Sequence, residues 1–160
     1  MSGPKRARLS EIDRLGMEAA LEAARHGGAA GEIPVGAAVV LDGRVLAAAH
    51  NQTIQRNDLT QHAELIVIRQ AMAAAATDRL DTASLYVTLE PCAQCAGAIV
   101  LARVGRVVFG AYDPKAGMGG SVGDLLRHPQ LNHRPEVVGG VMEKECGGVL
   151  KGFFHDKRDE

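Results

Sequence analysis

The spacing of hydrophobic residues along the chain changes repeatedly between the helical period of about 3.6 residues and the period of two that is typical of strands. Between residues 12 and 23 apolar side chains recur every three or four positions, shortly after Ser10, a favourable helix cap. Two apolar runs then flank Asp42-Gly43, a dipeptide that favours a β-hairpin. The same criteria predict, in chain order, helix 10–26 (ended by the glycines at 27, 28 and 31), strands 34–41 and 44–49, helix 62–76, strand 84–89, helix 92–102, strand 106–110, a short helix 124–127, strand 136–141 and helix 143–154.

The order of these elements predicts the fold class. A helix and a hairpin come first, and units of one helix and one strand follow, which favours an α/β fold with a mixed sheet of five strands and helices on both faces. No internal repeat and no linker interrupts the pattern. We therefore expect a single domain over residues 10–160, preceded by a flexible arm at residues 1–9.

Charge and composition restrict the classes of partner. The chain has 18 basic and 19 acidic residues, so binding driven mainly by bulk charge to phosphates is excluded, and a nucleic acid would have to be recognised by a local patch and by shape. Aromatic residues are only 3% of the chain, which limits generic base-stacking surfaces. No apolar stretch follows the basic N-terminus, and no run is long enough to span a membrane. We expect a soluble cytoplasmic protein without a membrane segment.

Three side chains are candidate metal ligands. Cys92 and Cys95 are three residues apart, so both sulfurs lie on one side of the first turn of a helix, whose N-terminus stabilises thiolates. His62 stands at the start of another predicted helix, in the pattern His62-Ala-Glu64. Each motif alone is explained as well by a buried cysteine pair, a redox couple or a helix cap. Together, at the starts of two helices, they predict a zinc site with three protein ligands.

Three ligands leave the fourth position of tetrahedral zinc open for a water, which is typical of catalytic sites. Glu64 lies about 200° around a regular helix from His62, so we expect it to act on that water as general acid and base instead of binding the metal. A closed structural site would need a fourth ligand. The remaining cysteine, Cys146, stands among apolar residues of the last helix, and we expect it to be buried in the core.

The pattern H-x-E followed by P-C-x-x-C is the signature of zinc-dependent nucleobase deaminases. Beyond it, nearly the whole chain resembles the bacterial tRNA-specific adenosine deaminases. The matching stretches are Glu32–Ala37, His50-Asn51, His62–Leu65, Leu85–Cys95, Ala96–Ile99, Arg106–Ala111, Asp113–Gly117, Asn132–Arg134, Glu145-Cys146 and Phe153-Phe154. Cytidine, guanine and riboflavin-precursor deaminases share the zinc signature, whereas the stretch after Arg106 favours the tRNA enzymes.

The resemblance implies a cytidine deaminase-like three-layer αβα sandwich that forms a homodimer with one Zn²⁺ per chain. It implies hydrolytic deamination of adenosine to inosine at the wobble position of a tRNA anticodon stem-loop. Its implied substrate contacts are Asn51, Asp113, Phe153 and Phe154. For Asp113, capping of its own loop is an equal alternative. Because adjacent residues of a helix diverge, we expect at least one of the two phenylalanines to lie in the core.

Four positions depart from the family pattern: Leu59, Gln61, Gln94 and His155. Gln61 and Gln94 each flank a predicted ligand, and three contacts are open to them: each other, the surroundings of the metal, or the rim of the pocket. His155 stands where a basic residue often follows the two phenylalanines, so its contact with RNA is also open.

Three other functions are consistent with parts of the pattern. The first is the same chemistry on a free base such as guanine, and the second is a non-catalytic zinc module closed by Cys146. The third is a catalytically inactive partner subunit of a heterodimeric editing enzyme. Glu64 argues against the second and the third, because neither needs an acid beside the metal.

Overall fold

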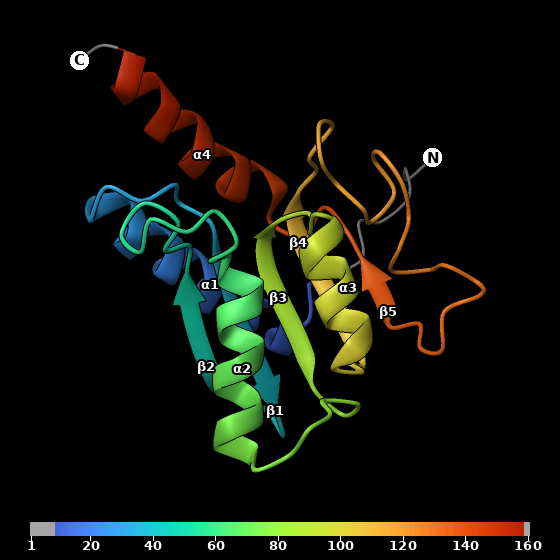
Figure 1. Cartoon of the computed structure of the whole chain (residues 1–160). Helices are drawn as coiled ribbons and strands as arrows, with labels where there is room; N and C mark the ends of the chain where they lie inside the picture. The colour runs from blue at the N-terminus through green and yellow to red at the C-terminus, as the bar shows by residue number, and fades with distance from the viewer. Residues whose placement is uncertain (1–8, 159–160) are drawn as a thin grey trace, which may run out of the picture.

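Five strands form one mixed sheet that lies between two layers of helices (Figure 1). The structure, a computed structural model, describes residues 9–158. Its helices are α1 (Glu11–Ala29), α2 (Ala63–Ala75), α3 (Ala93–Leu101) and α4 (Glu143–Arg158), and its strands are β1 (Gly36–Leu41), β2 (Arg44–His50), β3 (Ser84–Leu89), β4 (Arg106–Ala111) and β5 (Glu136–Val138). The strand order is β2-β1-β3-β4-β5, with antiparallel pairing around β1 and parallel pairing from β3 to β5. This confirms the predicted αβα sandwich. The predicted N-terminal arm lies outside the described residues except for Leu9.

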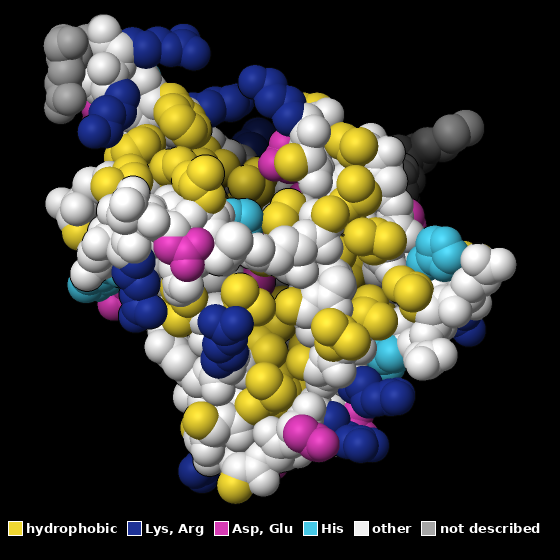
Figure 2. Space-filling model, viewed as in Figure 1, with side chains coloured by type: hydrophobic (Ala, Val, Ile, Leu, Met, Phe, Trp, Pro, Cys, Tyr) yellow, Lys and Arg dark blue, Asp and Glu magenta, His cyan; other side chains and the backbone are white. Residues whose placement is uncertain are grey.

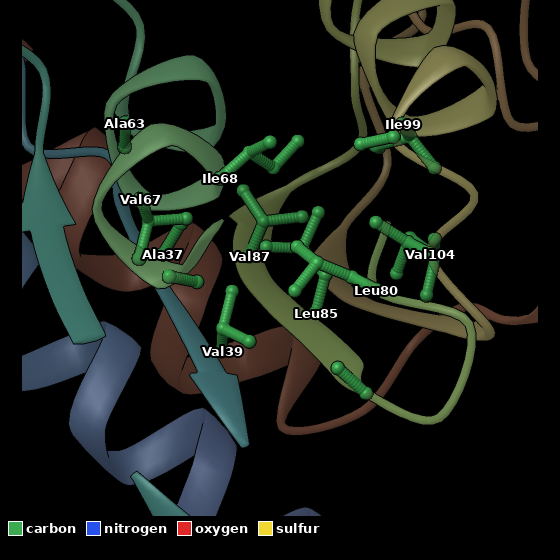
Figure 3. Close-up of a cluster of buried hydrophobic side chains, with 14 of the residues drawn as sticks. Ala37, Val39, Ala63, Val67, Ile68, Leu80, Leu85, Val87, Ile99 and Val104 are labelled. Carbon is green, nitrogen blue, oxygen red and sulfur yellow. The ribbon is translucent and has the colours of Figure 1, made fainter. Parts of the chain in front are cut away.

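Successive side chains of the central strands point to opposite faces of the sheet, so the hydrophobic core has two layers. On one face, Val39, Leu85 and Val87 pack with residues of α2 and α3, such as Val67 and Ile99 (Figure 3). The intervening residues of the same strands point to the opposite face and pack against α1 and α4; they include Ala38, Val40, Tyr86 and Val108. Because the side-chain period of a strand is two, the sheet is buried on both faces.

The topology gathers helix starts and strand ends at one edge of the sheet. The parallel strands β3 and β4 are connected through α3, as in a βαβ unit, so both strands end at the same edge. The N-terminal ends of α2 and α3 lie at this edge as well (Figure 1). The predicted ligands His62, Cys92 and Cys95 stand at these helix starts, so the fold itself brings them together.

Several elements differ from the predicted ones. Gly27 and Gly28 do not end the first helix, which continues to Ala29, and a Cβ added to Gly27 would lie 2.8 Å from the His50 ring. This glycine therefore serves close packing, not helix termination. The predicted helix at 124–127 is a turn, in which Asp124 bridges to Gly119. The last strand is also shorter than predicted, and the last helix is longer. Among the described helices, none has the length and apolar character needed to cross a membrane.

A partly buried ion pair that the sequence did not reveal joins the first helix to the sheet. The Asp13 carboxylate accepts hydrogen bonds from the Tyr86 hydroxyl at 2.8 Å and from Arg106 Nη2 at 3.0 Å. Arg106 also pairs with Glu136 at 3.3 Å. The Arg106 guanidinium, aided by Tyr86, holds the pKa of Asp13 below its ordinary value although burial opposes the shift. The network therefore connects α1 with β3, β4 and β5.

The Asp13→Asn variant should be less stable than the wild type by about 1.5–3 kcal/mol at pH 7, the size of a hydrogen bond to a charged group. The folded pKa of Asp13 is below its unfolded value of 3.8, so this stability is present above pH 3.8 and is lost as the pH falls through the folded pKa. Urea denaturation at pH 7, 5 and 3 measures it. An equal difference between the two proteins at pH 7 and pH 3 would contradict the assignment.

Candidate metal centre and active site

His62, Cys92 and Cys95 form a cluster whose geometry fits a metal ion. His62 is the N-cap of α2 and Cys92 the N-cap of α3, while Cys95 lies in the first turn of α3. The His62 Nδ1 atom is 3.5 Å from the Cys92 Sγ atom and 3.4 Å from the Cys95 Sγ atom. Zinc bonds of about 2.1 Å to nitrogen and 2.3 Å to sulfur, at a tetrahedral angle, separate these atoms by about 3.6 Å. The residues therefore fit zinc, and among the described residues no other His, Cys, Asp or Glu belongs to the cluster.

The electrostatics of the cluster favour thiolate formation. Hydrogen bonds from Cys95 and then from His62 lower the pKa of Cys92 to about 3, although burial opposes ionisation. The proton of the pair remains on Cys95, whose pKa is raised by its hydrogen bond to Cys92 and by burial. The pKa of His62 is raised, first by its hydrogen bond with Cys92. Since zinc binds thiolates, a dication among these donors would release the Cys95 proton.

Glu64 lies beside the cluster in the first turn of α2 and does not belong to it. Its side chain is buried, with 4% of the residue exposed, and it lies within interaction distance of Cys95 and His62. Burial is the main cause that raises the pKa of Glu64. A carboxyl group with a raised pKa donates a proton more readily at neutral pH than an ordinary carboxylate does, and its ionised form still accepts one, as acid–base catalysis requires.

Asn51 lies next to the start of α2. Its side-chain Oδ1 atom accepts a hydrogen bond from the Ala63 backbone N–H at 2.8 Å. The backbone N–H of Asn51 donates to Val35 O at 3.0 Å. These contacts fix the amide, so the Nδ2 atom is the group left for donation to a ligand. The structure thus places Asn51 beside the metal cluster, and its contact with substrate stays a prediction.

The two glutamines beside the ligands contact the same loop and not each other. Gln94 Nε2 donates to Thr60 O at 2.9 Å, and Gln61 Nε2 donates to Asp58 Oδ2 at 2.9 Å. The Gln94 bond connects the first turn of α3 with the segment that leads into His62. Of the three contacts that the sequence left open, Gln94 therefore makes the one at the rim of the site. Its hydrogen bond connects the segment that carries His62 with the helix that carries Cys95.

The predicted RNA contacts at the end of the chain are at the surface. Phe154 is 47% exposed and Phe153 is partly exposed, with ring centroids 5.5 Å apart. The expectation that one of them lies in the core is wrong, because neither ring belongs to a buried cluster. The C-terminal part of α4 extends away from the sheet (Figure 1). A groove of about 750 Å³ follows this part of the helix and is lined by Lys115, Leu150, Lys151, Gly152, Phe154, His155 and Arg158.

Asp113 caps its own turn. Its Oδ1 atom accepts hydrogen bonds from the Lys115 and Ala116 N–H groups at 3.0 and 3.2 Å, as in the capping alternative. This uses one carboxylate oxygen and leaves Oδ2 for another partner. Cys146 is fully buried on the opposite face of the sheet, among residues of α1, β3 and β4, and this confirms its predicted place in the core.

Two buried glutamates near the site were not predicted as functional residues. Glu32 is 1% exposed and accepts hydrogen bonds from the Ile54 and Gln55 N–H groups, in the loop that precedes His62. Glu90 is 2% exposed and lies two residues before Cys92. A glutamate in a loop is usually solvated, so the sequence carried no signal for them except that both lie in stretches matching the family.

Comparisons with known proteins agree with this geometry. The family model "Cytidine and deoxycytidylate deaminase zinc-binding region" matches residues 10–111. A tRNA-specific adenosine deaminase of Bacillus subtilis is 50% identical over 148 residues, which cover 91% of each chain. A structure from a study of A-to-I editing by tRNA:A34 deaminases at the wobble position of transfer RNA superposes with a TM-score of 0.82 and 47% identity, covering 86% of this chain and 99% of that chain. Guanine deaminase from Nitrosomonas europaea, at 22% identity and a TM-score of 0.76, covers 92% of this chain and 86% of that chain, and shares the fold.

Proposed function

Since the chain belongs to the family of zinc-binding cytidine and deoxycytidylate deaminases, and within it to the tRNA-specific adenosine deaminases, we propose that it converts adenosine to inosine at the wobble position of a tRNA anticodon. The observation that carries the proposal is the cluster of His62, Cys92 and Cys95 with the buried carboxyl of Glu64 beside it. We assign the activity to one zinc deaminase domain over residues 10–160.

One Zn²⁺ per chain would be held by His62 and the thiolates of Cys92 and Cys95. When bound, zinc supplies a Lewis acid that lowers the pKa of a water molecule to about 7. Glu64 takes one proton from the attacking water and delivers it to N1 of adenine, and it then carries the second proton of that water to the amino nitrogen on C6. The C6–N bond breaks, ammonia leaves, and the water oxygen remains as the C6 carbonyl of inosine. The burial of Glu64 excludes solvent from this transfer and raises the pKa of its carboxyl.

Recognition of the nucleotide depends on groups around this centre. Asn51 Nδ2 donates to an acceptor on the purine or its ribose, because Oδ1 already accepts from Ala63. The remaining Asp113 carboxylate oxygen accepts from a 2′-hydroxyl. Phe154, which is exposed, and Phe153, which is partly exposed, provide rings for unstacked anticodon bases. Lysine and arginine side chains stand around hydrophobic ones in this region, where α4 extends from the body (Figure 2). A chain of net charge −1 therefore offers a local basic groove to the phosphates.

A second copy of the chain completes the proposed assembly. Hydrophobic side chains gather over α2 and α3 on one face of the molecule (Figure 2), and Leu101 at the end of α3 is 84% exposed. An apolar surface of this kind favours association. We propose a cytoplasmic homodimer that contacts through this face.

Substrate preference tests the proposal. Deamination should be robust on an adenosine at the first anticodon position of an RNA stem-loop, because the loop already presents an unstacked base. It should be much slower on the matching DNA stem-loop and close to zero on free adenine, adenosine and guanine. Rates measured side by side by chromatography decide this. Faster turnover of guanine than of the RNA loop would overturn the substrate assignment and leave the zinc site in place.

A further inference from the structure

The carboxylate of Glu90 is surrounded by hydrogen-bond donors from a segment more than twenty residues further along the chain. Oε1 accepts from the Asp113 N–H at 3.0 Å and from the Ser121 hydroxyl, and Oε2 accepts from the N–H groups of Gly119 and Ser121 at 2.9 and 3.1 Å. Every partner is a donor. A carboxylate, which only accepts, satisfies all four, whereas the amide of a glutamine would place an N–H group against other donors.

The segment packs closely around this carboxylate. A Cβ added to Gly117 would lie 2.3 Å from Glu90 Cδ, so any side chain at this position would displace the carboxylate. The backbone gives two further connections: Glu90 N–H donates to Ala111 O at 2.8 Å, and Met118 N–H donates to Pro91 O at 2.8 Å. Residues 111–121 are therefore attached, by main chain and by side chain, to the two residues that precede Cys92.

Glu90 connects two groups of the proposed active site, the metal ligand Cys92 and the proposed ribose contact Asp113. Cys92 follows Glu90 by two residues and belongs to the metal cluster. Asp113, the proposed ribose contact, lies in the attached segment and donates its N–H to Glu90. A change at the Glu90 carboxylate therefore alters the placement of Asp113 relative to the metal centre. The three ligand atoms, by contrast, are supplied by α3 and by the segment that leads into α2, and none of them contacts this carboxylate.

We propose that Glu90 is a positioning residue that holds residues 113–121 as one wall of the substrate site. It orders Asp113 and its neighbours for the incoming RNA and takes no part in metal binding or proton transfer. The inference rests on the proposed function only in naming the substrate; the ordering of the segment by the carboxylate is a property of the chain itself.

The Glu90→Gln variant tests it, with Asp13→Asn as the matched control. Asp13 is also a buried carboxylate that accepts from several donors, but it lies on the α1 face of the sheet. Glu90→Gln should keep the zinc content of the wild type, raise KM for the RNA stem-loop about tenfold, the order of one lost hydrogen bond to a charged group, and change kcat less. Amide hydrogen exchange of residues 113–121 should become faster. Asp13→Asn should lower the melting temperature without altering KM or the exchange of this segment.

Unchanged KM and exchange in Glu90→Gln, or a loss of melting temperature alone as in the control, would overturn the inference. If Glu90→Gln does not fold, Ser121→Ala decides, since it removes one donor at the surface and should produce a smaller change in the same two measurements. If KM and the amide exchange of residues 113–121 are unchanged in Ser121→Ala, the positioning role of Glu90 is contradicted. A wild-type protein that fails to deaminate the RNA loop refutes the proposed function, while the exchange data still report whether Glu90 orders the segment.

Discussion

Replacement of Glu64 by alanine is expected to lower kcat by about 10²–10⁴-fold, the usual contribution of a general acid–base residue. The metal cluster should survive, because its three donors come from His62 and the two cysteines and do not include Glu64. Single-turnover rates on the RNA stem-loop, together with zinc analysis and RNA affinity, measure the effect.

Glu64→Gln is the matched control for shape, since it keeps the size of the side chain and removes its ability to move a proton. Both variants should bind zinc and RNA like the wild type. Near-normal turnover in either of them would remove Glu64 from the mechanism. Loss of zinc in both would show instead that Glu64 supports the metal.

Cys95→Ser should lose zinc and fold poorly, whereas Cys146→Ser should keep about one zinc per chain. Cys95 is fully buried and its sulfur lies 3.4 Å from His62 Nδ1, so the site loses a ligand that nothing nearby replaces. Metal binding and folding are coupled in such sites. The buried Cys146 lies on the opposite face of the sheet, where its serine variant loses only packing.

Metal analysis and thermal denaturation of both variants show which of the two cysteines binds zinc. Zinc loss from Cys146→Ser would indicate a closed structural site, which is the alternative to catalysis. Retention of zinc by Cys95→Ser would show that the cluster needs only two of its three donors.

The fold was predictable from the sequence where periodicity and turn chemistry agree. The hairpin around Asp42-Gly43 and the buried strand β3 were predicted because apolar runs ended by turn residues allow few other structures. The extent of α1 was not predicted. Glycine has a low helix propensity, but Gly27 lies inside this helix because it allows close packing against His50. The turn at 124–127 depends on a contact with Gly119, which no local pattern reveals.

Some functional residues were also predictable from the sequence, and others were not. His62, Cys92 and Cys95 were predicted because their side-chain types and their places at helix starts are specific to metal binding. Glu90 was not, since its role comes from donors that lie 23 to 31 residues away along the chain. Asp13 was missed for the same reason, with Arg106 as a partner 93 residues away. Burial of a carboxylate by distant donors is a property of the tertiary structure.

The central claim is that the chain produces inosine at the first anticodon position of tRNA. Total tRNA containing an unmodified adenosine at that position is incubated with the purified protein, with its Glu64→Ala variant and with protein stripped of metal by a chelator, and is then digested and analysed by mass spectrometry. The wild-type protein should convert adenosine to inosine at this position, the other two should produce almost none, and added zinc should restore the chelated sample. Intact adenosine after incubation with the zinc-loaded wild-type protein would contradict the account.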